Sequence, residues 1–379
     1  MFKKILKGLA GLLVTAVVLV IVVYIATGPQ RLGSDSASAS WLEDGPHSVG
    51  TAEFVFIDES RLTEENRGFP GKPNRSFQTW IWYPEDLPEP LPLIVHSHGI
   101  MSQGSELVNV AERLASNGYI VVAANYPLTN GGTEGGANAN DVVNQPADVS
   151  FLIDSVLNLS GEEKPFAGSI DPNRIGLSGY SLGGLTTVLA TYHPRWRDPR
   201  ISAAISIAGP INAFTPQFYS TRNIPFLGIY GTADALIDYE TNGLLVPERI
   251  RNSSLVTIAG GSHLGFMAIA DPVFRFMHNP DSIGCQGVLS VLDEGTDDVF
   301  MAFGTEAEVV LLDPSAPAVC EKMPPLEASH PGRQAMILEI AELAFFESVF
   351  GETEDIRSAA KEQLETSLAA DFEEASYLN

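Results

Sequence analysis

Between residues 50 and 270, short apolar runs alternate with stretches of helical spacing. Apolar runs of β type lie at 93–97, 119–125, 174–177, 203–207, 226–230 and 255–258. Helical spacing with one apolar side covers 104–117 and 145–159. Two alternating runs, 52–58 and 76–84, come first and predict an antiparallel edge pair. Strands and helices in this order predict an open, mostly parallel α/β sheet, whose ligands lie at the carboxyl ends of the strands.

The N-terminus has the pattern of a membrane anchor. Lys3, Lys4 and Lys7 precede a run from 8 to 27 that contains no charged residue. Twenty helical residues span about 30 Å, the thickness of a bilayer core. The lysines place the N-terminus in the cytoplasm, so residues 1–28 are expected to anchor a body that lies outside it, periplasmic or extracellular. A cleaved signal segment, which would release a secreted protein, is the alternative.

Composition shifts divide the rest of the chain. Residues 29–49 form a linker, in which 33–40 are small and polar and predict a flexible spacer. The folded body is expected at 50–350, and its last helix at 333–350. Residues 351–379 are acidic and rich in alanine, with apolar positions that roughly share one helical face. They predict either a loosely packed helix or a solvated tail.

Charge and cysteine content exclude several classes of protein. The 379 residues carry 22 Lys plus Arg and 47 Asp plus Glu, a formal net charge of −25. So acidic a surface repels phosphate backbones, which argues against nucleic acid as the main partner. Two cysteines are too few for a disulfide-dense small fold or a four-cysteine zinc site. The length suits one large α/β domain or two small ones.

A candidate nucleophile follows the run at 174–177. Gly179, Tyr180, Ser181, Leu182 and Gly183 form the chain's G-x-S-x-G sequence, with helical spacing behind it. A strand, a tight turn and a helix are the setting of a nucleophile elbow, which holds the serine hydroxyl above the sheet. The glycines at both flanks allow so tight a turn. Ser181 is therefore the expected nucleophile, and the alternative is a glycine-rich turn with an idle serine.

A serine nucleophile needs a base that an acid orients. Asp234 follows the run at 226–230, and His263 follows the run at 255–258. The chain order Ser, Asp, His is the one that an α/β-hydrolase sheet produces. Asp238 is the rival for the acid. The histidines that follow no core β-type run are expected to be structural or exposed; they are His47, His193, His278 and His330.

Two backbone N–H groups are expected to form an oxyanion hole. One belongs to Leu182, next to the nucleophile, and the other to Ile100, in the loop after 93–97. His96 and His98 have a spacing that metal sites use, but no Asp-His pair follows to complete a dinuclear site. We therefore do not expect a metal, and we expect His98 to support the oxyanion loop.

The segments LPLIVHSHG, LASNGYIVVAANYP, QPADVSFLID, NRIGLSGYSLGG and IYGTADALID occur in this order. Over about residues 75–270 the chain resembles the dienelactone hydrolase-like serine α/β-hydrolases, in the branch of platelet-activating-factor acetylhydrolase-like enzymes, chlorophyllases and bacterial polyester hydrolases. The resemblance implies a carboxylic-ester hydrolase without a cofactor that uses Ser181, Asp234 and His263, with Ile100 and Leu182 as oxyanion donors.

Three features qualify this resemblance. Tyr180 stands where the family usually has histidine, and its side chain is expected to point away from the reacting carbonyl. Dienelactone hydrolase itself has a cysteine nucleophile, and a serine there favours simple esters. Asp148, in QPADVSFLID, matches a family position whose expected role is structural.

Residues 266–331 exceed a minimal hydrolase and contain both cysteines. They are expected to form either a cap over the pocket or a surface insertion. Outside the cytoplasm Cys285 and Cys320 are expected to pair, and two free buried thiols are the alternative. The glycine-rich loop 130–140 is expected to border the active-site cleft.

The prediction is serine-dependent hydrolysis of carboxylic esters through an acyl-enzyme, by a lipase-like esterase tethered to a membrane through residues 8–27. The partner is a small-molecule or lipid ester. An acyltransferase or a peptidase would use the same triad, and a catalytically idle binding module is the alternative from another class. The substrate and the oligomeric state are not legible in the sequence.

Overall fold

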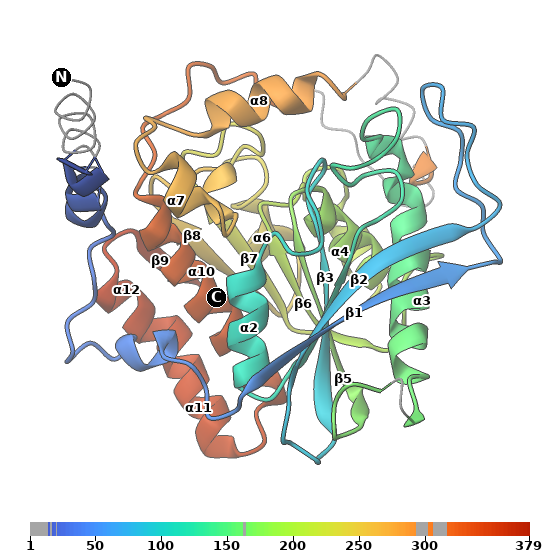
Figure 1. Cartoon of the computed structure of the whole chain (residues 1–379), viewed down its shortest axis with the longest axis horizontal. Helices are drawn as coiled ribbons and strands as arrows, with labels where there is room; N and C mark the ends of the chain where they lie inside the picture. Colours follow the sequence, from blue (N-terminus) through green and yellow to red (C-terminus); the bar gives the residue numbers. More distant parts are fainter. Residues whose placement is uncertain (1–13, 16, 20, 162–163, 293–301, 306–316) are drawn as a thin grey trace, which may run out of the picture.

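One sheet of nine strands forms the centre of the protein, with helices on both faces (Figure 1). The computed structural model describes residues 14–15, 17–19, 21–161, 164–292, 302–305 and 317–379. The strand order is β1-β2-β4-β3-β5-β6-β7-β8-β9. The strands are β1 (Val49–Asp58), β2 (Arg75–Pro84), β3 (Leu91–Ser97), β4 (Ile120–Ala124), β5 (Ile170–Tyr180), β6 (Ile201–Ile207), β7 (Phe226–Gly231), β8 (Ser253–Ile258) and β9 (Ala375–Leu378).

The six central strands, β4, β3, β5, β6, β7 and β8 in sheet order, pair in parallel. At the two edges β1, β2 and β9 pair antiparallel. The predicted mostly parallel sheet, with an antiparallel pair at its start, is confirmed. Because the central strands run in one direction, their carboxyl ends and the loops that follow them meet at one edge of the sheet.

Two helical layers cover the sheet. The helices are α2 (Val108–Ser116), α3 (Gln145–Leu157), α4 (Leu182–Tyr192), α5 (Pro216–Tyr219), α6 (Leu245–Arg249), α7 (Ala270–Phe274), α8 (Asp281–Leu289), α10 (Pro331–Phe350), α11 (Glu354–Glu362) and α12 (Leu368–Asp371). Side chains of a strand alternate between the faces. Ile120 and Val122 of β4 pack in the core with α3 and α4, whereas Val121 packs in the core with α2 and α10.

The C-terminal segment belongs to this core: a helix forms as expected, but it is packed tightly, so loose packing and a solvated tail are both wrong. After α11 and α12 the chain forms β9, which pairs with β8 and extends the sheet. Leu368 and Phe372 are 0% exposed. The helical spacing was visible in the sequence, but the spacing alone does not specify that its apolar side packs against the preceding helix, α10.

The small polar residues of the linker are also packed at their carboxyl end. Ser38 is buried; its N–H donates to Asp371 Oδ2 at 2.8 Å, and its hydroxyl accepts from Gln363 Nε2 at 2.7 Å. Residues Ala39–Leu42 form a 3-10 turn beyond it. The prediction of a flexible spacer is therefore wrong here, because small side chains let this segment lie against the C-terminal helices.

Part of the predicted N-terminal span, residues 8–13, 16 and 20, lies outside the described residues, as do Lys3, Lys4 and Lys7. Among the residues that are described, no helix has the length and apolar character needed to cross a bilayer. The end of the segment contacts the body: the Arg275 guanidinium lies over the Tyr24 ring at 3.8 Å and donates to the Tyr24 carbonyl at 2.8 Å.

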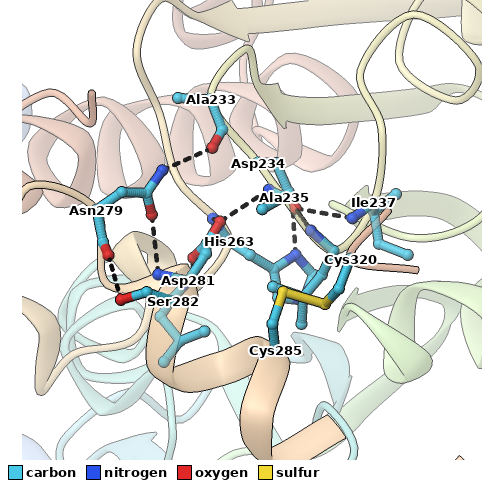
Figure 2. The surroundings of a disulfide bond; sticks show 12 residues. Ala233, Asp234, Ala235, Ile237, His263, Asn279, Asp281, Ser282, Cys285 and Cys320 are labelled. Carbon is cyan, nitrogen blue, oxygen red and sulfur yellow. Dashed lines mark hydrogen bonds and ion pairs between the residues drawn. A yellow bond between two sulfur atoms is a disulfide. The ribbon is translucent and has the colours of Figure 1, made fainter. Parts of the chain in front are cut away.

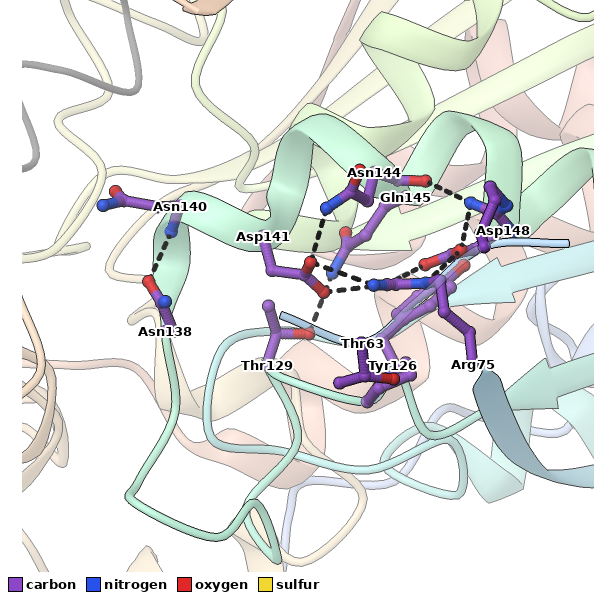
Figure 3. Close-up of polar contacts among 12 residues, drawn as sticks. Thr63, Arg75, Tyr126, Thr129, Asn138, Asn140, Asp141, Asn144, Gln145 and Asp148 are labelled. Carbon is purple, nitrogen blue, oxygen red and sulfur yellow. Dashed lines mark hydrogen bonds and ion pairs between the residues drawn. The ribbon is translucent and has the colours of Figure 1, made fainter. Parts of the chain in front are cut away.

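A buried ion network holds the start of β2 against α3 (Figure 3). The Arg75 guanidinium, 1% exposed, donates to both carboxylate oxygens of Asp148 and of Asp141 at 2.6–3.1 Å. Arg61 makes a further ion pair with Asp148 at 2.7 Å. Arg61 also pairs with Asp58 at 2.7 Å, so each carboxylate of this network has an arginine partner. Removing one member of such a buried pair costs about 3–5 kcal/mol, which gives Asp148 the structural role expected for it.

Candidate active site

The loop after β5 is a strained turn that exposes one hydroxyl. Ser181 has φ 56° and ψ −116°, a backbone conformation that costs a residue with a Cβ atom about 1–3 kcal/mol. A Cβ added at Gly179 would lie 2.1 Å from the Gly183 carbonyl oxygen, and one at Gly183 would lie 1.9 Å from the Ser97 carbonyl oxygen. Only glycine fits at both flanks, and this steric requirement explains the two glycines of the G-x-S-x-G sequence.

The structure brings the three predicted side chains into one hydrogen-bonded chain. The Ser181 hydroxyl lies 2.9 Å from His263 Nε2, and His263 Nδ1 lies 2.7 Å from Asp234 Oδ2. Since a carboxylate only accepts, Nδ1 carries the proton and Nε2 is free to accept from the serine. The residues follow β5, β8 and β7, so the parallel sheet assembles them from points as far as 82 positions apart.

The Asp234 carboxylate is itself fixed by its own loop. Its Oδ1 accepts from the backbone N–H groups of Leu236 and Ile237, both at 2.8 Å, which leaves Oδ2 for the histidine. The rival Asp238 turns elsewhere and bonds to the Thr241 N–H at 3.0 Å and to the ammonium of Lys322. The geometry therefore favours Asp234 as the acid.

The environment of His263 stabilises its protonated form. Burial, the largest influence, disfavours a charged ring, but the charge and the hydrogen bond of Asp234 outweigh it. Asp281 and Glu106 add to this effect, and the net result is a raised pKa of His263. A ring of this kind takes a proton readily from a serine hydroxyl and holds it while an oxyanion exists.

The loop after β3 carries the second predicted oxyanion donor. Both oxygens of Glu106, at 3.0 and 3.2 Å, accept from the N–H of Gly99, the residue before Ile100. The Met101 N–H donates to the Thr129 carbonyl at 2.8 Å. Within the described chain neither the Ile100 nor the Leu182 N–H donates to a backbone carbonyl. The loop is thus anchored on both sides of an available N–H group.

His98 supports this loop, as expected. Its Nε2 accepts from the Tyr126 N–H at 3.1 Å, so its Nδ1 carries the proton and donates to the Gly99 carbonyl at 2.7 Å. Burial lowers the pKa of His98 and keeps the ring neutral. The glycine-rich loop 130–140 lies beside the same segment, where the Gly131 N–H donates to the Ser102 carbonyl at 2.8 Å.

His96 belongs to a buried polar cluster rather than to a metal site. Its Nε2 lies 3.0 Å from Glu106 Oε1, and the nearby Ser178 hydroxyl donates to Glu342 Oε2 at 2.9 Å. Burial raises the pKa of Glu342 to about 7. In the described parts of the chain no group of three His, Cys, Asp or Glu side chains could hold a metal ion. Ser178 points away from His263 and is not a second nucleophile candidate.

Tyr180, expected to point away from the reacting carbonyl, packs against the base. Its hydroxyl donates to the His263 carbonyl at 2.9 Å, and its ring lies against the imidazole with centroids 5.0 Å apart. These two contacts hold Tyr180 against His263 and restrict the position of that ring.

The segment 266–331 is attached to the loops that carry the acid and the base (Figure 2). Cys285 and Cys320 form a disulfide across 35 positions, a closure worth about 3–4 kcal/mol in the chain-entropy model. Asp281 accepts hydrogen bonds from the Ala235 and His263 N–H groups. Residues 293–301 and 306–316 of the predicted cap lie outside the described residues.

Sequence reasoning missed Glu106 and Asp281. Each is an isolated acidic residue near the start of a helix, which is an ordinary position for a solvated side chain. Neither stands in a motif, and only the fold brings the loops to which they bond within reach.

Comparison with known proteins identifies the family of this chain. A family model described as PET hydrolase-like matches residues 62–277, more than half of the chain. The chain belongs to the PET hydrolase-like family. This confirms the resemblance to the polyester hydrolase branch that the sequence motifs indicated.

Two curated relatives carry esterase-type names. A protein named as the esterase NocK, from Nocardia uniformis subsp. tsuyamanensis, is 28% identical over 157 residues, which are 41% of this chain and 43% of that protein. A protein named as a carboxymethylenebutenolidase, from Yersinia pestis, is 24% identical over 173 residues, which are 42% of this chain and 62% of that protein. Each alignment thus spans less than two thirds of the relative.

A solved structure shows the same fold over almost the whole length. The ferulic acid esterase from Streptomyces cinnamoneus superposes with a TM-score of 0.53 at 18% identity, covering 87% of this chain and 96% of its own. The α/β-hydrolase fold predicted from the strand pattern is thereby confirmed.

Proposed function

We propose that the protein hydrolyses carboxylic esters through an acyl-enzyme formed on Ser181. The observation that carries this proposal is the hydrogen-bonded chain from Ser181 Oγ through His263 to Asp234, at 2.9 and 2.7 Å. Membership of the PET hydrolase-like family and the names of the curated relatives support the same chemistry. Small terephthalate esters are therefore reasonable substrates to try beside simple aliphatic esters.

The geometry provides each step of the reaction. Ser181 Oγ attacks the ester carbonyl while its proton passes to His263 Nε2, and Asp234 stabilises the imidazolium. The Ile100 and Leu182 N–H groups receive the developing oxyanion. Collapse breaks the bond to the alcohol, which leaves with the proton from His263. Water then attacks the acyl group by the same route and releases the acid and free Ser181.

The wild-type chain tests this proposal directly. We expect it to hydrolyse p-nitrophenyl esters and bis(2-hydroxyethyl) terephthalate, and to react with a fluorophosphonate whose adduct maps to the peptide containing Ser181. Transfer of the acyl group to an added alcohol, with little free acid, would favour an acyltransferase. A folded protein that neither labels nor cleaves any ester would favour the binding module.

We also propose that the body lies outside the cytoplasm, tethered to a membrane through residues 8–27. The uncharged run after three lysines supports this, and so does the exposure of the apolar residues described in it, such as Val14 at 62% and Ile25 at 73%. The full chain should then stay with membranes through alkaline carbonate extraction. Its appearance in the soluble fraction, with residues 1–28 still attached, would contradict the anchor.

A further inference from the structure

A carboxylate that no motif marks lies against both the acid and the base of the candidate triad. Asp281 is the first residue of α8 and is 0% exposed. Its Oδ2 accepts from the N–H groups of Ala235 and His263, and its Oδ1 accepts from the N–H of Leu264, all at 2.9 Å (Figure 2). All three bonds come from backbone donors, and none from a basic side chain.

The three donors belong to the two loops whose separation the reaction depends on. Ala235 follows the acid Asp234 in the loop after β7, and His263 is the base in the loop after β8. The distance between Asp234 Oδ2 and His263 Nδ1 is set by where these loops sit. One carboxylate that bonds to both of them fixes that separation directly.

Asp281 is in turn held in place from both sides. The Asn279 side chain accepts from the Asp281 N–H at 2.8 Å and donates to the Ala233 carbonyl at 2.9 Å. One turn along α8, Cys285 is bonded to Cys320, whose N–H donates to the Ala235 carbonyl at 3.1 Å. The acid loop is therefore bonded to this segment at Ala233 and Ala235, on either side of Asp234.

We propose that Asp281 is a positioning residue for the ester hydrolysis proposed above, which fastens the acid loop and the base loop together and adds negative charge behind His263. The inference rests on that proposed function. It assigns the segment 266–331 a role in assembling the triad, whether or not the segment also covers the pocket.

The charge of Asp281 distinguishes this role from simple packing, because a charge changes the pKa of His263. Among the described residues, the acidic groups near His263 are Asp234 in the acid loop, Asp281 in α8 and Glu106 before α2, and all three raise its pKa. Tyr180 also packs against the ring, but burial raises the pKa of its hydroxyl, so it stays neutral. Burial, followed by repulsion from Asp234, raises the pKa of Asp281 itself to about 6. The negative charge of Asp281 favours the protonated form of His263. Removing that charge lowers the pKa of His263, and Asp281→Glu, which disturbs the packing but keeps the charge, separates this effect from a purely structural one.

The test follows the pH dependence of fluorophosphonate labelling in the full chain, in detergent micelles, for the wild type, Asp281→Asn and Asp281→Glu. Only neutral His263 activates Ser181, so the labelling rate rises with pH through the pKa of His263. In Asp281→Asn we expect this rise at lower pH than in the wild type, and a plateau rate lower by about 10²-fold because the loops shift. Asp281→Glu keeps the charge but displaces the carboxylate. For this variant we expect a lower plateau labelling rate, reached through a rise at the same pH as in the wild type.

Asp271→Asn is the matched control. Asp271 lies in α7 of the same segment but pairs with Arg275 and His330, so its replacement should leave both the plateau and the rise unchanged. An Asp281→Asn profile that rises at the wild-type pH would overturn the electrostatic part of the proposal. A full plateau rate in Asp281→Glu would overturn the positioning part, even if Asp281→Asn does not fold. Absence of labelling in the wild type would instead refute the proposed function.

Discussion

Replacement of Ser181 by alanine is expected to lower kcat for ester hydrolysis by about 10⁶-fold and to abolish fluorophosphonate labelling. The loss is so large because no other described hydroxyl shares the 2.9 Å contact with His263 Nε2. Alanine carries the same Cβ into the strained turn at φ 56°, so the melting temperature should change little. Steady-state kinetics with a p-nitrophenyl ester measure the loss of kcat, and a gel-based assay measures the loss of fluorophosphonate labelling.

Ser178 provides the matched control for this variant. It lies three residues away and is also buried, but its hydroxyl donates to Glu342 rather than to the base. Ser178→Ala should therefore keep the labelling. Labelling that survives in Ser181→Ala and disappears in Ser178→Ala would show that the nucleophile is Ser178 and not Ser181.

Replacement of Asp234 by asparagine is expected to lower kcat by about 10⁴-fold at neutral pH. The Leu236 and Ile237 N–H groups both donate to Oδ1, so the amide oxygen of an asparagine must take that place. Its NH₂ group then faces His263 and donates to Nδ1. The histidine proton moves to Nε2, and the ring can no longer accept from Ser181.

Asp238→Asn is the comparison that decides between the two acids. Asp238 bonds to Thr241 and Lys322 on the side away from the histidine, and its loss should leave kcat near the wild-type value. A large loss in Asp238→Asn together with an active Asp234→Asn would reverse the assignment. The measurement is kcat for one ester across both variants, with melting temperatures to confirm folding.

The parts of the site that sequence patterns located are those fixed by local backbone geometry. Gly179 and Gly183 must be glycine because any Cβ would collide with a carbonyl oxygen, so the turn that presents Ser181 is written in five consecutive residues. Asp234 and His263 could be placed because each directly follows an apolar strand, and parallel strands deliver the residues after them to one edge. Features of this kind can be predicted without knowing which residues meet from distant parts of the chain.

The parts that patterns missed depend on partners far along the chain. Residues 351–379 have a visible helical face, but it is the pairing with β8, far earlier in the chain, that makes 375–378 a strand. The same holds for Ser38, whose partners Gln363 and Asp371 lie more than 320 positions away. A polar, small-residue segment reads as a flexible linker until the surface that it covers is known.

The sequence by itself determined the parallel part of the sheet, the tight turn at Ser181 and the chain order of Ser181, Asp234 and His263, because strand periodicity and a sterically forced turn are local properties. Only the tertiary structure decided what stabilises that machinery. Glu106 bonds to Gly99 beside the oxyanion loop, and Asp281 bonds to the acid and base loops together. A carboxylate can accept from any backbone N–H that the fold brings near it, so neither partner leaves a motif in the sequence.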